Sequence, residues 1–124
     1  RDERKPLQLI EELFNRYPIT EFSDEEIATY NYLKGRNLYL RGEFLSALRH
    51  LSKALTFTKD DKRKADIYNT TANCFTDNLF FDEAMQLAKK ALKIRKKLYL
   101  NEDKLNSLSL IGGIYLKQNN LEKA

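Results

Sequence analysis

The sequence contains very little of the side-chain chemistry that disulfides and metal sites need. Among its 124 residues there is one cysteine, Cys74, and one histidine, His50. A single cysteine excludes an internal disulfide, and together with one histidine it argues against a zinc cluster. We therefore expect no metal and no cofactor, and a reducing, cytoplasmic location is the simplest fit.

Turn-forming residues and long apolar runs are scarce as well. The chain has four glycines, two prolines and no Asn-Gly or Asp-Gly step, so β-hairpins have little to form around. No apolar run approaches the roughly 20 residues that cross a bilayer, and no signal-peptide pattern opens the chain. Hydrophobic residues nevertheless make up 42% of the sequence, which is enough to build a core. We therefore expect a folded, all-α chain without a membrane segment.

The two ends of the sequence lack the usual features of chain termini. The first residue is Arg1 rather than methionine, and Ala124 ends the chain inside an apparent helical pattern. We expect the parent protein to be longer, with part of its function encoded outside these residues. An apolar unit exposed at such an end can pair with a copy of itself, which makes a homodimer through exposed repeat ends a further expectation.

An internal repeat is the strongest pattern that is present. Three segments, residues 35–47, 72–84 and 112–124, share a small residue, a large apolar residue, a turn, an aromatic residue or leucine, and then alanine. The closing alanines Ala47, Ala84 and Ala124 lie 37 and then 40 residues apart, a period typical of solenoids built from helix pairs. Apolar residues then recur at i, i+3, i+4 and i+7, so each complete unit contains two helices.

The small residues of this repeat resemble those of the tetratricopeptide repeat family. The resemblance implies an all-α, right-handed superhelical solenoid of antiparallel helix pairs, in which the paired helices approach closely at small side chains. The matching positions are Gly35, Ala72 and Gly112 on the first helices and Ala47, Ala54, Ala84 and Ala91 on the second. The sequence departs from the family at Asn31 and Leu108, where an early aromatic residue is frequent.

The repeat boundaries divide the chain into four segments. Residues 1–22 are expected to form an N-terminal helix and linker, either a half repeat or a cap, with Pro6 in the first turn and the helix ending before Pro18. Residues 23–59 and 60–99 are the first and second repeats. Residues 100–124 are the first helix and the start of the second helix of a truncated third repeat. The prediction is thus about two and a half repeats plus the N-terminal helix.

Capping residues predict where individual helices begin and end. Ser23 and Glu26 are placed for a capping box that opens a helix ending near Arg41, where Gly42 supplies a left-handed turn. We expect a second helix to end near Phe57. In the second repeat Asn78 is expected to take the left-handed position, and in the third the turn is expected at Asn119–Asn120.

In a solenoid of this family, the first helices of successive repeats line the concave side, so partner-binding residues are expected there. In the second repeat six residues form an apparently uncovered polar stripe at helical spacing: Asp66, Asn69, Thr70, Asn73, Thr76 and Asp77. Tyr32, Arg36 and Tyr39 are the expected contributors from the first repeat. Amide side chains such as Asn69 and Asn73 can hold a peptide backbone, because an amide donates and accepts hydrogen bonds together. The alternative is that this stripe is an ordinary solvated helix face.

Other functions are disfavoured by the residues present. The basic run of residues 84–104 could meet phosphates, but its lysines lie opposite the packing alanines, so nucleic acid is a weaker interpretation than a solvated surface. Catalysis is not expected, because His50 and Cys74 fall in different repeats without a surrounding motif. The basic residues of the chaperone-binding carboxylate clamp are also missing: Tyr32, Thr70, Asn106 and Leu110 stand at the matching positions.

Two functional hypotheses therefore remain open. The first is a non-catalytic protein-protein or peptide-binding module whose groove is formed by the first helices. The second is a regulatory input domain of a bacterial signalling protein, because the stretched repeats resemble those that precede diguanylate cyclase, histidine kinase or DNA-binding output domains. A protein or peptide partner is common to both.

Overall fold

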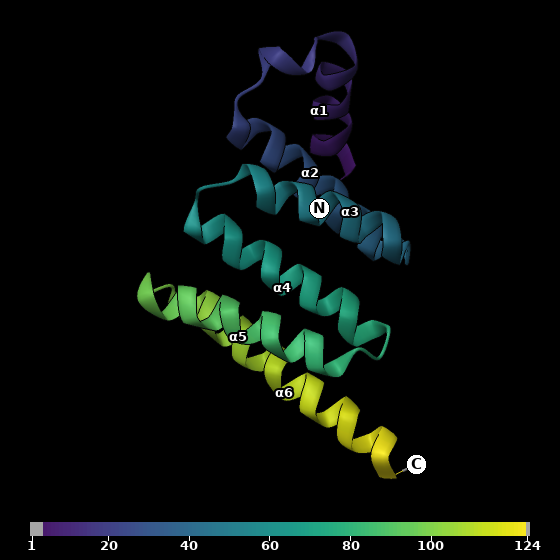
Figure 1. Cartoon of the computed structure of the whole chain (residues 1–124), viewed down its shortest axis with the longest axis vertical. Helices are drawn as coiled ribbons and strands as arrows, with labels where there is room; N and C mark the ends of the chain where they lie inside the picture. Colours follow the sequence, from purple (N-terminus) through teal and green to yellow (C-terminus); the bar gives the residue numbers. More distant parts are fainter. Residues whose placement is uncertain (1–3, 124) are drawn as a thin grey trace. The chain divides into compact units, whose positions relative to one another are not determined.

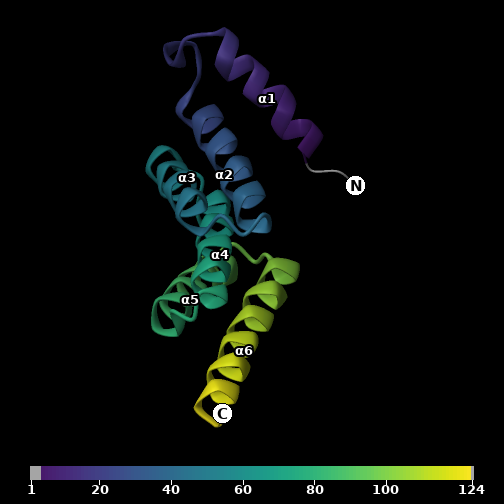
Figure 2. The ribbon, with the colours of Figure 1, turned by 90° about the vertical axis from the view of Figure 1, so that its right-hand side faces the viewer.

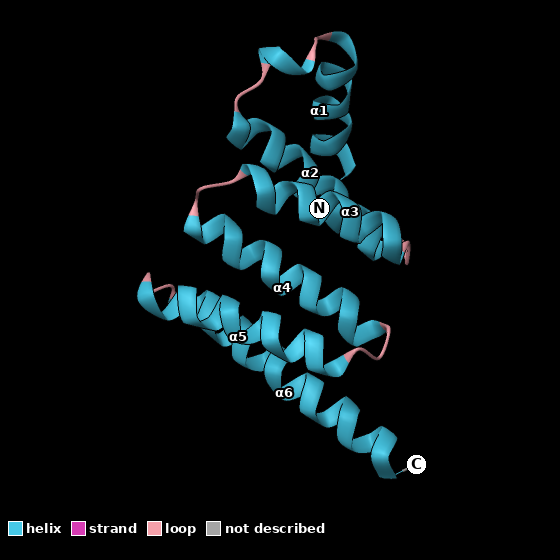
Figure 3. Cartoon of the chain, viewed as in Figure 1, coloured by secondary structure: helices cyan, strands magenta, loops and turns pink. Residues whose placement is uncertain are grey.

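The computed structural model describes residues 4–123, and within that range the chain is helical and contains no β-strand (Figures 1 and 3). The all-α prediction is confirmed. The elements in chain order are α1 (Arg4–Arg16), the short 3-10 helix η1 (Ile19–Glu21), α2 (Asp24–Leu40), α3 (Phe44–Phe57), α4 (Asp61–Asp77), α5 (Phe81–Lys97) and α6 (Asn101–Lys123).

The chain divides into two compact units, Arg1–Lys59 and Asp60–Ala124, and each is described by itself. The first unit contains α1, η1, α2 and α3, and the second contains α4, α5 and α6. The boundary falls between Lys59 and Asp60, where the sequence analysis ends its first repeat.

The start of α2 has the capping box that the sequence predicts. The Ser23 hydroxyl accepts a hydrogen bond from the Glu26 amide at 3.1 Å, and the Glu26 carboxylate accepts one from the Ser23 amide at 2.8 Å. Two of the amides left without partners at a helix start are thereby satisfied. The neighbouring Glu25 carboxylate accepts from the Thr58 hydroxyl at 2.7 Å and from the Lys59 amide at 2.8 Å, which ties the end of α3 to the start of α2.

Close packing of α2 on α3 depends on the small residues. Ala47, Ala54 and Leu51 on α3 are buried, with exposed fractions of 1% or less. A Cβ atom added at Gly35 would lie 2.7 Å from the Leu51 Cγ, so a larger residue at this crossing would force the packed helices to shift. The predicted packing role of Gly35 is confirmed.

Aromatic side chains hold α1 against α2. The Phe14 ring stacks on Phe22 and on Tyr30, with ring centroids 4.0 Å and 4.6 Å apart. The Glu11 carboxylate contacts the Lys34 ammonium group at 3.0 Å. As predicted, α1 is a separate helix that ends before Pro18.

In the second unit, α4 and α5 form a pair and α6 packs beside them (Figure 2). The core is built from buried Ala72 on α4, Ala84 and Ala88 on α5, and Ile114 on α6. Partly buried apolar side chains surround it: Phe75, Phe81, Met85, Leu87, Leu110 and Ile111. Alanines at the α4–α5 contact again let the two helices approach closely.

The turn after α4 differs from the prediction by one residue. The left-handed residue is Leu79 (φ 69°), not Asn78 (φ −104°). The Phe80 amide donates to the Phe75 carbonyl at 2.8 Å and the Leu79 amide to the Thr76 carbonyl at 3.1 Å, the pattern of a Schellman motif. In this motif the left-handed residue directly follows the C-cap of the helix, and the C-cap of α4 is Asn78.

The same turn closes α2 and α5. Gly42 (φ 78°) is left-handed as predicted, and Tyr99 (φ 58°) takes the corresponding place after α5. Their amides donate to Tyr39 and Lys96, at 2.9 Å and 3.1 Å. Three helices therefore end in one local geometry, although only one of them has a glycine there.

The predicted turn at Asn119–Asn120 is absent, because α6 continues through both residues to Lys123. A turn there is stabilised when a second helix packs back on the first, and the described residues 121–123 do not form such a helix. Nothing lies within 4 Å of a Cβ atom added at Gly112, so no described helix approaches α6 closely at this position, and its packing role stays a prediction.

Candidate functional site

The polar stripe predicted on α4 is largely covered, not open. Thr70 and Thr76 are buried, with exposed fractions of 8% and 4%. Their hydroxyls donate to the carbonyls of Asp66 and Ala72, one turn earlier on the same helix, at 3.0 Å and 2.8 Å. A threonine hydroxyl satisfied in this way can be buried without an unpaired group. The expectation of an uncovered stripe is therefore wrong for these two residues.

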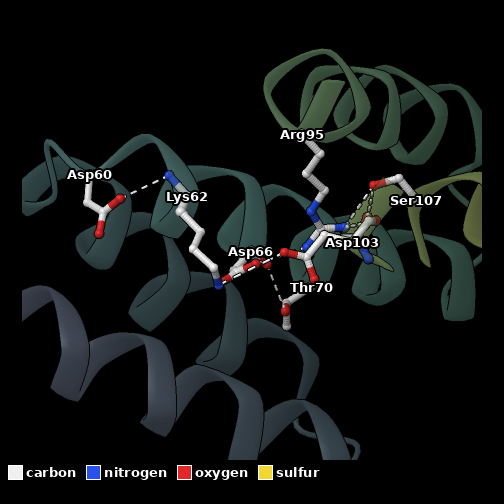
Figure 4. Close-up of polar contacts among 8 residues, drawn as sticks. Asp60, Lys62, Asp66, Thr70, Arg95, Asp103 and Ser107 are labelled. Carbon is white, nitrogen blue, oxygen red and sulfur yellow. Dashed lines mark hydrogen bonds and ion pairs between the residues drawn. The ribbon is translucent and has the colours of Figure 1, made fainter. Parts of the chain in front are cut away.

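Arg95 of α5 reaches the stripe from the interior of the unit (Figure 4). One guanidinium nitrogen, Nη2, donates to the Asp66 Oδ1 at 2.9 Å. The other, Nη1, donates to the Ser107 hydroxyl at 2.8 Å and to the Asp103 carbonyl at 3.1 Å. Arg95 is only 4% exposed, and its contact with Ser107 is buried, whereas those with Asp66 and Asp103 are partly buried. They join α4, α5 and α6 at a single side chain.

Two neighbouring contacts extend this cluster. The Lys62 ammonium group lies 3.6 Å from the Asp66 Oδ2 and 4.0 Å from the Asp103 Oδ2. The Ser107 hydroxyl donates to the Asn69 Oδ1 at 3.3 Å. The side chains of Asp66 and Asn69 are thus engaged within the unit, where they hold helices together.

Arg95 and Ser107 were missed as key residues by the sequence analysis, although a pattern for Arg95 existed. It belongs to the basic run of residues 84–104, yet it lies four residues after Ala91 and seven after Ala88, on the helix face that packs inward. A charged residue at such a position needs a buried partner. Asp66 is that partner.

The far end of the stripe does remain accessible. The Asp77 carboxylate and the Lys117 ammonium group lie 3.5 Å apart, with side chains 49% and 55% exposed. They line a hollow of about 390 Å³ between the ends of α4 and α6. Its other walls are Thr76, Leu79, Asn120 and Leu121. Half-buried Asn73 lies one turn before Asp77 on α4. We call the hollow lined by these six residues the α4–α6 hollow, and Asn73 is its neighbour on α4.

The three residues predicted on α2 belong to the first unit. Tyr32, Arg36 and Tyr39 are half-buried and follow one another at i, i+4 and i+7, so they share a helix face. The Arg36 guanidinium lies over the Tyr32 ring, 5.7 Å from its centroid, in a cation-π contact. The structure thus keeps these three residues together on one face of α2.

The one histidine is engaged within the first unit. The His50 Nδ1 lies 2.8 Å from the Oδ1 of Asn31, a side chain that is 2% exposed. Partial burial, and then the charges of Lys34, Arg49 and Lys53, lower the pKa of His50. His50 is half-buried. Among residues 4–123 no group of histidine, cysteine and carboxylate side chains is arranged to hold a metal ion.

Cys74 is expected to be unreactive in the folded protein. Its thiol is 1% exposed, and burial, followed by the charge of Asp77, raises its pKa to about 11. At about pH 8 only about a thousandth of such a thiol is thiolate, the reactive form. We expect an aromatic disulfide reagent to label the folded chain at least about 100-fold more slowly than the chain unfolded in guanidinium chloride. Equal labelling rates would contradict this expectation.

Comparisons with known proteins give no family for this chain. No protein-family model, no curated protein and no solved structure matches it. In the described residues no helix is both long enough and apolar enough to cross a bilayer.

Proposed function

We propose that the chain is a non-catalytic protein-interaction module of the tetratricopeptide type, in which the pairs α2–α3 and α4–α5 are successive repeats. The two pairs share the features that define the repeat. Each has a buried small residue on its first helix, Gly35 or Ala72, and fully buried alanines on its second. Each first helix also ends in a Schellman turn. The right-handed superhelical stacking of the repeats is part of this proposal.

The main support for a binding function is the α4–α6 hollow. Its ion pair is exposed, and exposed pairs contribute only about 0–1 kcal/mol, so Asp77 and Lys117 can be separated by a competing charged ligand at little cost. Leu79 and Leu121 are 59% and 50% exposed, which provides apolar surface beside the charges. The combination fits a peptide that carries one apolar side chain next to a charged group.

This assignment narrows the binding surface predicted from sequence. Asn73, Thr76 and Asp77 stay within it, whereas Asp66, Asn69 and Thr70 are given a structural role by their internal contacts. Of the two asparagines expected to hold a peptide backbone, Asn73 is the one that stays in this surface.

A displayed library of random peptides tests the proposal. We expect peptides selected on the chain to bind the variant Asn73→Ala with Lys117→Glu at least about tenfold more weakly, measured by fluorescence anisotropy. The matched control is Asn37→Ala with Lys93→Glu, which changes the charge equally but lies on α2 and on the exposed side of α5. Circular dichroism checks that each variant folds.

The proposal fails if the library yields no specific peptide. It also fails if the selected peptides bind the hollow variant and the control with equal affinity, because the binding surface would then lie elsewhere.

A further inference from the structure

Helix α6 has two apolar faces, and the structure covers one of them. Ile114, Leu110 and Ile111 pack into the core of the second unit. The opposite side, which we call the outer face of α6, consists of Leu105, Leu108, Gly112, Tyr115, Leu116 and Asn119. At about 100° per residue these six positions fall within a sector about 100° wide. A helix that is apolar on both sides is ordinarily covered on both.

The outer face is strongly exposed within the chain. Leu105, Leu108, Tyr115 and Leu116 are 66%, 50%, 57% and 61% exposed. A hollow of about 580 Å³ lies along this side, with Gly112, Tyr115, Leu116 and Asn119 among its lining residues. Four large apolar side chains in one row form a contiguous patch of the kind that marks an interaction surface.

Gly112 lies at the centre of this face and has open space above it. Nothing lies within 4 Å of a Cβ atom added there, whereas the same test at Gly35 meets Leu51 at 2.7 Å. Glycine is a poor helix former, and at Gly35 it is retained because a second helix crosses there. The outer face thus has a small residue at its centre, as α2 has at Gly35. At Gly112, however, no described helix crosses it.

The charges at the two ends of α6 indicate which helix fits. The first turn is acidic and carries Glu102, and the last turn carries Lys123. Glu102 lies ten residues before Gly112 and Lys123 eleven residues after it. If a second α6 crosses antiparallel at Gly112, Glu102 of each copy lies beside Lys123 of the other. A parallel crossing would place like charges together.

The rest of the face is self-complementary under the same rotation. Leu108 and Leu116 lie four residues on either side of Gly112, so each meets the other across the two-fold axis. Lys104 and Glu122 lie at similar distances, eight residues before it and ten after it, and form a second pair of opposite charges. Self-complementarity of one patch is the requirement for an isologous dimer.

We propose that two copies of this chain form a two-fold dimer in which their α6 helices pair antiparallel and cross at Gly112. The surface is separate from the α4–α6 hollow, whose α6 residues Lys117 and Leu121 point away from the outer face. The dimer therefore does not depend on the proposed peptide binding.

Sedimentation velocity over a range of protein concentrations tests the dimer. We expect the unmodified chain to dimerise and Leu108→Glu with Leu116→Glu to be monomeric, because four carboxylates would meet at the crossing. The control Leu9→Glu with Leu45→Glu adds the same charge at exposed leucines of the first unit and is expected to dimerise normally. Because all four leucines are exposed in the single chain, we expect both variants to keep the helical circular dichroism of the parent.

A disulfide tests the geometry of the crossing. In a Cys74→Ser background, Gly112→Cys places two thiols at the two-fold axis, where helices this close allow a disulfide. We expect air oxidation to give covalent dimers of Gly112→Cys and none of Lys93→Cys, on the exposed side of α5. We also expect Glu102→Lys alone to weaken the dimer and Glu102→Lys with Lys123→Glu to restore it.

Three results would overturn the proposal. The first is a chain that stays monomeric at every concentration, which would leave the outer face to another helix or protein. The second is a dimer unaffected by Leu108→Glu with Leu116→Glu. The third is a dimer whose Gly112→Cys variant gives no covalent product, because α6 would then cross elsewhere. None of these results bears on the peptide selection, which uses substitutions outside the outer face.

Discussion

Arg95→Met is expected to lower the free energy of unfolding by about 2–4 kcal/mol. The substitution keeps a side chain of similar length but removes the donors that bind Asp66, Ser107 and the Asp103 carbonyl. The cost arises mainly because their acceptor groups lose a buried partner. The expected loss is smaller than the largest losses seen when a buried ion pair is broken. The reason is that the Asp66 side chain is 23% exposed and keeps its contact with Lys62. Urea unfolding followed by circular dichroism measures it.

Lys93→Met is the matched control for Arg95→Met. It removes one positive charge from the same helix, but Lys93 is exposed, so its effect is expected to be within about 0.5 kcal/mol of zero. The double variant Asp66→Asn with Arg95→Met is expected to lose less unfolding free energy than the two single variants lose together. In the double variant residue 66 is uncharged, so no carboxylate is left without its arginine. An Arg95→Met variant as stable as Lys93→Met would show that the cluster contributes nothing.

Gly35→Val is expected to destabilise the first unit by about 3 kcal/mol. A Cβ atom at this position would lie 2.7 Å and 2.9 Å from two carbons of Leu51 and 3.3 Å from the Ala47 carbonyl oxygen. Leu51 is 1% exposed and cannot move aside without disturbing its own neighbours. Gly35→Ala should lower the free energy of unfolding less than Gly35→Val does. Alanine is better than glycine as a helix former by about 1 kcal/mol, which offsets part of the clash. Thermal and urea unfolding compare the two.

Gly113→Ala provides the opposite outcome in the same experiment. Nothing lies within 4 Å of a Cβ atom at Gly113, so the helix-forming advantage of alanine is unopposed and a gain of about 0.5–1 kcal/mol is expected. Gly113 also lies outside the outer face of α6. If Gly35→Ala and Gly113→Ala changed stability in the same direction, the close crossing at Gly35 would be excluded.

Helix boundaries could be predicted from the sequence where the responsible contacts are local. The Ser23–Glu26 capping box joins residues three positions apart, and the left-handed turn at Gly42 needs only the absence of a Cβ atom. Both were predicted from composition and spacing alone. The same holds for the packing alanines, because the face that they share follows from helix periodicity.

The turn after α4 was misplaced because contacts across the whole turn outweigh the preference of a single residue. Asparagine tolerates the left-handed region better than leucine, which favoured Asn78. The Schellman hydrogen bond from Phe80 to Phe75 places Leu79 there instead, and the two phenylalanine rings contact edge to face with centroids 6.0 Å apart. Ring packing of this kind is not visible in a residue preference.

The candidate site was predicted only in part, because periodicity identifies a polar face but not what covers it. Asp66 and Asp77 occupy equivalent places in the stripe pattern, eleven residues apart. One is paired with buried Arg95 and the other with exposed Lys117. The difference depends on α5 and α6, which pass close to one end of the stripe and leave a hollow at the other.

The partly buried hydrogen bond between Asn31 and His50 has a consequence for the alignment of α2 and α3. Alanine-lined helix contacts are smooth, so a helix can shift along its neighbour by one turn with little loss of apolar contact. Asn31 also donates to the Ile27 carbonyl at 2.9 Å, which leaves its Oδ1 fixed in one direction toward His50. A shift by one turn would leave this amide oxygen buried without a donor, and buried polar groups specify a unique register in this way. We therefore expect Asn31 to select a single position of α3 along α2.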